Sequence, residues 1–195
     1  IGIGPSSSHT MGPMVAAHRF LFHCLDQAQT SGKSLSHIRV SLHGSLAFTG
    51  KGHASDRAIY LGLQGYLPET LELEKIESLE AALYKNKRIT LSGHNSFAFD
   101  PEADLIFDYD LALPAHPNGM QFYGYDEQGA LLSHEVYYSI GGGFVRRDDE
   151  MGEQHDDASP AHPYPFATAA MMLEMGNDSG LTVAEMQFAN ECAYR

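Results

Sequence analysis

Three segments in the first half of the chain carry apolar side chains at the three- and four-residue spacing of an amphipathic helix. They cover residues 11–29, 54–65 and 71–84. The first segment is the clearest, and its apolar positions are Met11, Met14, Val15, Leu21, Phe22, Leu25 and Ala28. Residues 30–32, Thr-Ser-Gly, follow it, and a polar stretch that ends in glycine is typical of a helix end. The pattern therefore predicts three helices before residue 85.

Strands are predicted where β-branched and aromatic residues alternate with polar ones. Such runs cover residues 37–42, 87–91 and 104–109. The strongest local signal is a hairpin, because the runs 120–125 and 130–140 are joined by the short loop Asp-Glu-Gln-Gly. The second half of the chain is therefore expected to begin with antiparallel strands.

Glycine and proline mark the longer connections. The glycine-punctuated connection 44–52 is expected to contain a short extended piece, and the Pro-rich connection 113–119 leads into the hairpin. An acidic loop that contains proline, 148–165, follows the hairpin. Two of the four candidate segments described below, 50–53 and 116–119, lie at these connections.

Two further helices are predicted after the acidic loop, at 166–175 and 182–193, with the glycines of 176–180 between them. Thr182 and Glu185 have the spacing of a capping box at the start of the second helix. Helical and extended segments are interspersed along the chain, and two of the strands form a hairpin. The sequence therefore predicts an α+β fold in which helices pack on a mixed β-sheet.

The composition is that of a folded globular chain, with 43% hydrophobic and 10% aromatic residues. Twenty-five acidic side chains against twelve basic ones give a formal net charge of −13. This charge argues against a nucleic-acid partner, because binding to phosphates needs clustered Lys and Arg. No apolar run approaches the roughly 20 residues of a membrane helix, so no membrane partner is expected.

Cysteine usage and the chain ends bear on compartment and completeness. Cys24 and Cys192 are the only cysteines, which fits the reducing cytoplasm, so we expect a cytoplasmic location. The sequence begins at Ile1, without Met and already inside a Gly/Ser-rich motif, and it stops at Arg195 just after a helical pattern. We therefore expect an N-terminal piece of a longer protein.

The opening segment is the first candidate for chemistry. Directly before the first predicted helix stand Ser6, Ser7, Ser8, His9 and Thr10. Hydroxyl groups there can cap free backbone N–H groups, and a helix N-terminus with free N–H groups suits a carboxylate. The alternative is a flexible lead-in with a single capping residue, and the composition leaves both interpretations open.

Residues 50–53, Gly-Lys-Gly-His, form the second candidate. His53 is expected just before the helix at 54–65, where the positive end of the helix dipole disfavours an imidazolium and keeps the ring neutral near pH 7. A neutral imidazole is what a general base requires, and the flanking glycines would leave it accessible to a substrate. The alternative is a surface histidine in a turn or at a helix N-cap.

Residues 116–119, His-Pro-Asn-Gly, form the third candidate and precede the hairpin. Asn118 offers a donor and an acceptor, and His116 offers either one at neutral pH. The pair could therefore bind the ammonium and carboxylate groups of an amino acid. The alternative is a tight turn, for which these residue types are the usual choice.

The fourth candidate is the segment 137–143, Tyr-Tyr-Ser-Ile-Gly-Gly-Gly, at the end of the second hairpin strand. Gly141, Gly142 and the glycine after them can present successive N–H groups to an anion. They can equally form a bulge or a bend packed against another backbone, and Ser139 can serve only to cap that turn. The sequence favours neither interpretation.

No metal site is expected inside the chain. The eleven histidines include no H-x-x-x-H pair on a predicted helix, and two cysteines cannot by themselves hold an iron–sulfur cluster. A pyridoxal-phosphate enzyme would need a Schiff-base lysine and a phosphate cradle. Lys51 is the one tempting candidate for the lysine, and nothing else in the sequence supports that cofactor.

Together, the four candidate segments resemble a known family. Residues 4–14, Gly-Pro-Ser-Ser-Ser-His-Thr-Met-Gly-Pro-Met, are similar to the opening signature of the iron–sulfur-dependent L-serine dehydratases. The resemblance continues, in the order of the family, with His-Gly-Ser-Leu (43–46), Thr-Gly-Lys-Gly-His (49–53), Pro-Asn-Gly-Met (117–120), Tyr-Tyr-Ser-Ile-Gly-Gly-Gly-Phe (137–144) and Pro-Tyr-Pro-Phe (163–166). Residues 67–113 carry little of this pattern, so the resemblance implies no role for them.

The resemblance implies that residues 1–165 are the β domain of such an enzyme and that residues 166–195 are a helical extension leading to an absent α domain. The implied fold is α+β with helices on a mixed sheet, similar to the allosteric substrate-binding domain of phosphoglycerate dehydrogenase. The α domain would supply the cysteines that ligate a [4Fe–4S] cluster. The enzyme would be a homodimer.

The implied reaction converts L-serine to pyruvate and ammonia. Iron would act as a Lewis acid on the serine hydroxyl, a base would remove the α proton, and the enamine left after loss of water would become an imine that hydrolyses. The family's base matches His53. The implied substrate-cleft positions are His116, Asn118, Ser139, Gly141 and Gly142, and residues 6–10 would belong to the part of the cleft that faces the cluster domain.

Two functions stay open at this point. In the first, the chain contributes His53 and cleft residues to an active site completed by the cluster domain, and the isolated chain is inactive. In the second, the chain is a regulatory module that binds L-serine and has no catalytic residues, as the similarity to an allosteric binding domain implies. Binding of L-serine by the isolated chain would favour the second function.

Overall fold

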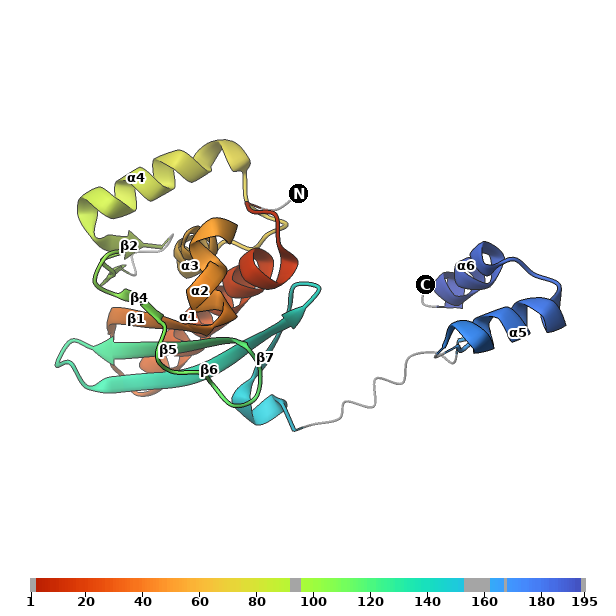
Figure 1. Ribbon diagram of the computed structural model, residues 1–195. Helices are drawn as coiled ribbons and strands as arrows, with labels where there is room; N and C mark the ends of the chain where they lie inside the picture. Colours follow the sequence, from red (N-terminus) through yellow and green to blue (C-terminus); the bar gives the residue numbers. More distant parts are fainter. Residues whose placement is uncertain (1–2, 92–95, 153–161, 167, 194–195) are drawn as a thin grey trace. The chain divides into compact units, whose positions relative to one another are not determined.

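The computed structural model describes residues 3–91, 96–152, 162–166 and 168–193 (Figure 1). The chain divides into two compact units, Ile1–Gly152 and Glu153–Arg195. The domain boundary expected at residue 165 rests on the resemblance and stays a prediction. In the described ranges, no helix combines the length and the apolar character needed to cross a membrane.

The first unit is built on a mixed β-sheet. Its strands, within the described residues, are β1 (Leu35–Gly44), β2 (Arg88–Thr90), β3 (Ser96–Ala98), β4 (Leu105–Asp108), β5 (Asn118–Asp126), β6 (Leu131–Gly141) and β7 (Phe144–Arg147). They lie in the order β2-β3-β1-β5-β6-β7, and β4 also pairs with β1. Strands β3 and β4 run parallel to β1, whereas the other neighbouring pairs are antiparallel.

Helices form a layer over this sheet (Figure 1). In the described part of the first unit they are η1 (Ser7–Met11, a π-helix), α1 (Gly12–Thr30), α2 (Ser45–Thr49), η2 (Gly50–His53, a 3₁₀-helix), α3 (Ser55–Leu63), η3 (Leu73–Lys75), α4 (Ile76–Asn86) and η4 (Asp148–Glu150). Helix α1 packs against α3 and against β1, β5 and β6, and α4 packs against α3. The long helix α1 therefore links the sheet to the other helices.

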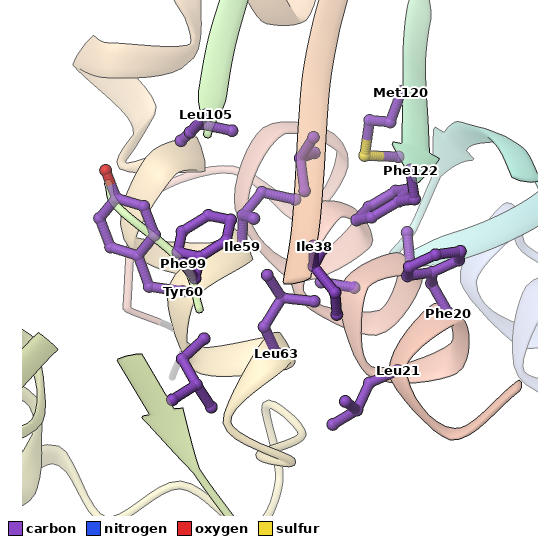
Figure 2. Close-up of a cluster of buried hydrophobic side chains, with 14 of the residues drawn as sticks. Phe20, Leu21, Ile38, Ile59, Tyr60, Leu63, Phe99, Leu105, Met120 and Phe122 are labelled. Carbon is purple, nitrogen blue, oxygen red and sulfur yellow. The ribbon is translucent and has the colours of Figure 1, made fainter. Parts of the chain in front are cut away.

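The main hydrophobic core lies between the helical layer and the sheet. Figure 2 shows side chains from both sides, among them Phe20 of α1, Ile59 of α3, and Ile38, Met120 and Phe122 of the sheet. All five are fully buried, and the rings of Phe20 and Phe122 stack with their centroids 5.1 Å apart. Complete burial of one such side chain contributes about 1.5–3 kcal/mol relative to its exposure. This contact fixes α1, which directly follows η1, to the strand beneath it.

The expected α+β fold is confirmed. The helices predicted at 11–29 and 54–65 are α1 and α3, and the predicted hairpin is formed by β5 and β6. Gly129 closes that hairpin with a φ of 76°, a left-handed conformation that favours glycine. The agreement is best where an element is long enough to show several periods of its pattern.

The expectations about short elements were less accurate. The connection 44–52 contains α2 and most of η2, so the predicted extended piece is wrong: Gly44, with a φ of 55°, turns the chain out of β1 and the next residues close helical hydrogen bonds. The helix predicted at 71–84 begins at Ile76, after the short helix η3. Strands β3 and β7 were not predicted, although the equally short strands β2 and β4 lie within the predicted runs 87–91 and 104–109.

The second unit contains two described helices, α5 (Ala169–Ser179) and α6 (Val183–Ala193). The capping box is confirmed, since the N–H of Thr182 donates to Glu185 Oε2 at 2.8 Å and the N–H of Glu185 donates to Thr182 Oγ1 at 3.3 Å. Helix α5 begins later than predicted and continues to Ser179, where Gly180 ends it with a φ of 70°. Residues 153–161 of the acidic loop lie outside the described residues.

Candidate active site

The opening Ser-rich segment forms one turn of π-helix, η1, directly before α1. Ser6 is its N-cap, and Ser6 Oγ accepts a hydrogen bond from the backbone N–H of His9 at 3.2 Å. Ser7 is exposed on this turn, whereas Thr10 is fully buried. Single π-helical turns are uncommon and are frequent at functional sites. The segment is therefore a capped helical turn with both exposed and buried hydroxyls.

His9 lies between two hydroxyl groups that engage both of its ring nitrogens. Its Nδ1 is 2.9 Å from Ser8 Oγ, and its Nε2 is 2.9 Å from Ser45 Oγ of α2. A hydroxyl can donate to one nitrogen and accept from the other, so the neutral ring satisfies both bonds. Partial burial lowers the pKa of His9, and the neighbouring His53 lowers it further. The ring is thereby held neutral and fixed in orientation.

His53 lies beside His9, with the two ring centroids 4.9 Å apart. Its Nδ1 is 2.9 Å from the carbonyl oxygen of Thr49. A carbonyl oxygen only accepts hydrogen bonds, so Nδ1 carries a proton and donates it. In the neutral ring Nε2 then holds a lone pair, and the side chain is half-buried rather than enclosed. This is the tautomer in which Nε2 can take a proton from a substrate.

Contacts with the backbone join the two histidines into one unit. Thr10 Oγ1 donates to the carbonyl oxygen of His53 at 2.7 Å, and Ser55 Oγ donates to the carbonyl oxygen of His9. Ala54, directly after His53, adopts left-handed backbone with a φ of 56°. That conformation costs a residue other than glycine roughly 1–2 kcal/mol. The surrounding hydrogen bonds therefore hold a strained turn that sets the direction of the His53 ring.

The position of His53 relative to α3 refines the expectation from the helix dipole. His53 ends η2, and Ala54 separates it from α3, which begins at Ser55. The contact that orients the ring is the carbonyl oxygen of Thr49, four residues earlier in the chain. Thr49 is the last residue of α2, a helix that the sequence did not predict, whereas the sequence suggested only that the dipole of the following helix would keep the ring neutral.

A second polar group lies where β1 ends and β5 begins. Asn118 is buried, and its Nδ2 donates to the carbonyl oxygen of Ser139 at 3.1 Å. The backbone N–H of Asn118 donates to Nδ1 of His116 at 3.1 Å. Asn118 begins β5, so it is a strand residue and not the centre of a turn. The carbonyl oxygen of Pro117 accepts from the N–H of Ser45 at 2.9 Å, which places this group next to the histidine pair.

Ser139 is fully buried on β6, against the first residue of α1. A Cβ atom on Gly12 would approach Ser139 Oγ to 2.0 Å, so only glycine fits at that contact. Among the described residues, Ser139 Oγ has no hydrogen-bond partner. The Ser139 side chain packs between α1 and the sheet, and the backbone carbonyl oxygen of Ser139 accepts the hydrogen bond from Asn118. A direct contact between this hydroxyl and substrate stays a prediction.

Gly141 and Gly142 lie at the turn from β6 to β7. Their φ angles are 102° and 62°, and Gly143 follows with 85°. A Cβ atom on Gly143 would lie 3.7 Å from Met11 Cβ of η1, so the turn lies beside the opening segment. The glycines therefore form a bend packed near another part of the chain, and their binding of an anion stays a prediction.

Sequence reasoning missed three contributors to this site: the hydroxyls of Ser45 and Ser55 and the carbonyl group of Thr49. Ser45 and Thr49 lie within the segments 43–46 and 49–53, which resemble the family's pattern, but the resemblance assigned no role to either residue. The contact between Ser45 and His9 joins residues 36 positions apart. Spacing along the sequence could not predict it.

His43, at the end of β1, is a further buried histidine that the candidates did not include. Its Nδ1 donates to the carbonyl oxygen of Leu111 at 3.2 Å, and its Nε2 accepts from Ser41 Oγ at 2.8 Å and from Gln121 Nε2 at 3.3 Å. Burial lowers the pKa of His43, and the contacts with Leu111 and Asp108 oppose this shift. His43 therefore ties β1 to β5 and to the connection before it as a neutral ring.

Residues 1–150 match the family model described as the serine dehydratase beta chain. This match contains all four candidate segments and covers most of the chain. The chain belongs to this family. The histidine pair and the polar group at Asn118 are thus features of a serine dehydratase beta chain.

Relatives of this family member match along its whole length. The chain is 38% identical to an L-serine dehydratase of Streptomyces coelicolor and 39% identical to the L-serine dehydratase TdcG of Escherichia coli, each over 198 aligned residues. It is 36% identical to an L-serine dehydratase of Haemophilus influenzae over 99% of the chain. The alignments cover 43%, 42% and 42% of these three relatives. The beta chain thus spans less than half the length of the curated relatives it matches.

The described residues do not provide the ligands of an iron–sulfur cluster. Cys24 is buried in the main core, and burial raises the pKa of its thiol to about 12. Cys192 is exposed on α6 of the other unit. In the described ranges, no three His, Cys, Asp or Glu side chains are grouped so that they could hold a metal ion. The cysteine ligands of such a cluster would have to come from outside this chain.

Proposed function

We propose that this chain is the β domain of an L-serine dehydratase and that it supplies the general base, His53, for conversion of L-serine to pyruvate and ammonia. Two findings support the proposal. The chain belongs to the serine dehydratase beta chain family, and its full-length relatives are named L-serine dehydratases. The geometry around His53 gives that residue the properties of a base.

The hydrogen bond from His53 Nδ1 to the carbonyl oxygen of Thr49 carries this proposal. Removal of the α proton of serine needs an unprotonated nitrogen within hydrogen-bond reach of the substrate. Protonation of Nδ1 leaves Nε2 as that nitrogen, and the half-buried side chain gives access to it. His9 engages both of its own nitrogens with serine hydroxyls, so it positions the neighbouring groups and leaves the proton transfer to His53.

The remaining residues of the site are assigned to binding. Ser7 presents an exposed hydroxyl on η1, next to the partly buried Ser6 and Ser8, while Thr10 holds the backbone of His53. Nδ1 of His116 accepts from a backbone N–H, so in the neutral ring Nε2 carries the proton and can donate to a carboxylate. The proposed substrate-binding set is completed by His9, Asn118, Ser139, Gly141 and Gly142.

The proposal includes components outside this chain. A [4Fe–4S] cluster would be ligated by cysteines of an α domain, with which the β domain would share the active site. The isolated chain would then have no dehydratase activity. A homodimer in the cytoplasm, with L-serine as substrate, completes the proposed assembly.

Replacement of His53 by glutamine in the full-length enzyme tests the assignment. Glutamine retains an N–H donor but has no basic nitrogen, so kcat should fall by about 100-fold or more while the thermal unfolding temperature stays unchanged. The matched control is His134→Gln, at an exposed histidine of β6, which should leave kcat near that of the wild type. A pH profile separates a chemical role from a structural one, because only loss of the base removes the ascending limb of kcat/KM.

The regulatory alternative makes a different prediction for the same variants. If the chain only binds L-serine at a regulatory site, His53→Gln should retain turnover close to that of His134→Gln. That result would refute the assignment of His53 as the base. Calorimetric titration of the isolated chain with L-serine would then show binding without the α domain.

A further inference from the structure

Ser45 lies between the two polar groups of the candidate active site. It is the first residue of α2 and is half-buried. Its hydroxyl oxygen lies 2.9 Å from Nε2 of His9, and its backbone N–H donates to the carbonyl oxygen of Pro117 at 2.9 Å. Its own carbonyl oxygen accepts from Thr49 Oγ1 at 2.8 Å. The hydroxyl, the N–H and the carbonyl group of this one residue therefore bond to three different parts of the site.

The two backbone bonds of Ser45 extend to the groups assigned to substrate binding and to proton transfer. Pro117 is the middle residue of the segment 116–118, whose other two members are both assigned to binding. Thr49, whose hydroxyl bonds to Ser45, also provides the carbonyl oxygen that accepts from Nδ1 of His53. A displacement of Ser45 would therefore reach both sides of the cleft.

The position of Ser45 is fixed by the residues on either side of it. Gly44 has a φ of 55°, a conformation that favours glycine. A Cβ atom on Gly44 would lie 2.3 Å from the carbonyl oxygen of Pro117, so the absence of a side chain permits this close approach. Leu46, on the other side, is fully buried in the main core. Ser45 is thus held by a close backbone contact and by core packing.

We propose that Ser45 is a positioning residue of the dehydratase reaction and that its hydroxyl acts through the ring of His9. The inference rests on the proposed function, because His9 is assigned there to the substrate-binding set. Without the hydroxyl, Nε2 of His9 loses its partner and the ring is free to turn. Binding groups that are not held in place lose part of their effect on the reaction rate. Ser45 itself touches no reacting atom.

Ser45→Ala and Ser45→Thr in the full-length enzyme test the role of the hydroxyl. Alanine keeps both backbone bonds and removes the bond to His9, so kcat/KM for L-serine should fall about tenfold, the effect of one hydrogen bond. Threonine keeps the hydroxyl and should restore most of the loss. The matched control is Ser41→Ala, which removes a bond of 2.8 Å between another half-buried serine and Nε2 of His43, outside the site. The control should leave kcat/KM near the wild-type value.

A double-mutant cycle with His9→Ala shows whether Ser45 acts through that ring. Ser45→Ala should lower kcat/KM much less when residue 9 is already alanine, because the bond that it removes is then absent. A purely structural role would give losses that add. The ascending limb of the pH profile of kcat/KM should persist in Ser45→Ala, since His53 keeps its basic nitrogen.

Three results would overturn the inference: additive losses in the cycle, Ser45→Ala as active as Ser41→Ala, or loss of the ascending limb in Ser45→Ala. Each differs from the failure of the proposed function, in which His53→Gln retains turnover. If His53→Gln is inactive while the losses in the cycle add, the base assignment stands and the role of Ser45 is refuted.

Discussion

Replacement of Gly12 by alanine sets helix propensity against packing at the contact between α1 and β6. Alanine is favoured over glycine inside a helix by about 0.8–1.0 kcal/mol. The new Cβ atom, however, would lie 2.0 Å from Ser139 Oγ and 2.8 Å from Ser139 Cβ. Carbon atoms in contact are normally about 3.5–4.0 Å apart. Ser139 is fully buried on a strand that pairs on both sides, so it cannot move aside and α1 has to shift.

The packing effect is expected to exceed the gain in propensity. Overpacking of a well-packed core costs about 1–3 kcal/mol, and a contact as short as 2.0 Å belongs at the upper end. After subtraction of the propensity gain, Gly12→Ala should destabilise the first unit by about 1–2 kcal/mol. For a chain of this size the unfolding temperature should fall by about 2–8 °C. Thermal unfolding followed by circular dichroism measures this shift.

Two further variants separate packing from a general effect of alanine. Gly52→Ala is the matched control, because nothing lies within 4 Å of a Cβ atom at that position, and it should not lower the unfolding temperature. Ser139→Ala introduced into Gly12→Ala removes the nearer of the two contacts and also a buried hydroxyl without a described partner. It should restore part of the loss. Gly12→Ala with wild-type stability would refute the reasoning.

Two other predictions concern titration and reactivity. The pKa of His43 is lowered in the folded chain. Its contribution to stability is therefore fully present above the unfolded pKa of about 6.5 and is lost as pH falls from there toward the folded pKa. Between about pH 7.5 and 5, the free energy of unfolding measured with urea should decrease less for His43→Gln than for the wild type. Cys24 is buried and the pKa of its thiol is raised to about 12, whereas Cys192 is exposed. A maleimide at pH 7 should therefore modify Cys192 and spare Cys24 until the chain is unfolded, and equal labelling of both in the folded chain would contradict their placement.

The fold could be predicted from the sequence where a pattern repeats within one element. Helix α1 shows its apolar stripe over five turns, and the β5–β6 hairpin combines two runs with a turn that ends in Gly129. Strands β3 and β7 are as short as β2 and β4, yet the sequence predicted only the latter two. Helix α2 has only five residues and η2 contains two glycines, so neither shows a repeating pattern, and their helical conformation depends on the sharp turn at Gly44 and on packing against neighbouring elements.

The sequence identified several residues of the candidate site, but it did not predict which of them contact one another. The segments 4–14 and 49–53, which resemble the family's pattern, indicated His9 and His53 as separate candidates. The two rings come into contact only when η1 is placed against η2. The same placement forms the bond from Thr10 to the carbonyl oxygen of His53, which joins residues 43 positions apart. Ser139, expected among the cleft residues, packs under α1, because its direction is set by the alternation of β6.

The sequence by itself determined the class of fold, the family and the residue types available for chemistry, because periodicity and motif order are properties of neighbouring positions. Only the tertiary structure decided which ring nitrogen of His53 holds a proton and which hydroxyls fix His9. The bond between His9 and Ser45 joins residues 36 positions apart, and the bond between His53 and Thr49, four residues away, forms because α2 and η2 fold as helices at that place. Such contacts follow from strand register, turn geometry and core packing, and no local pattern records their outcome.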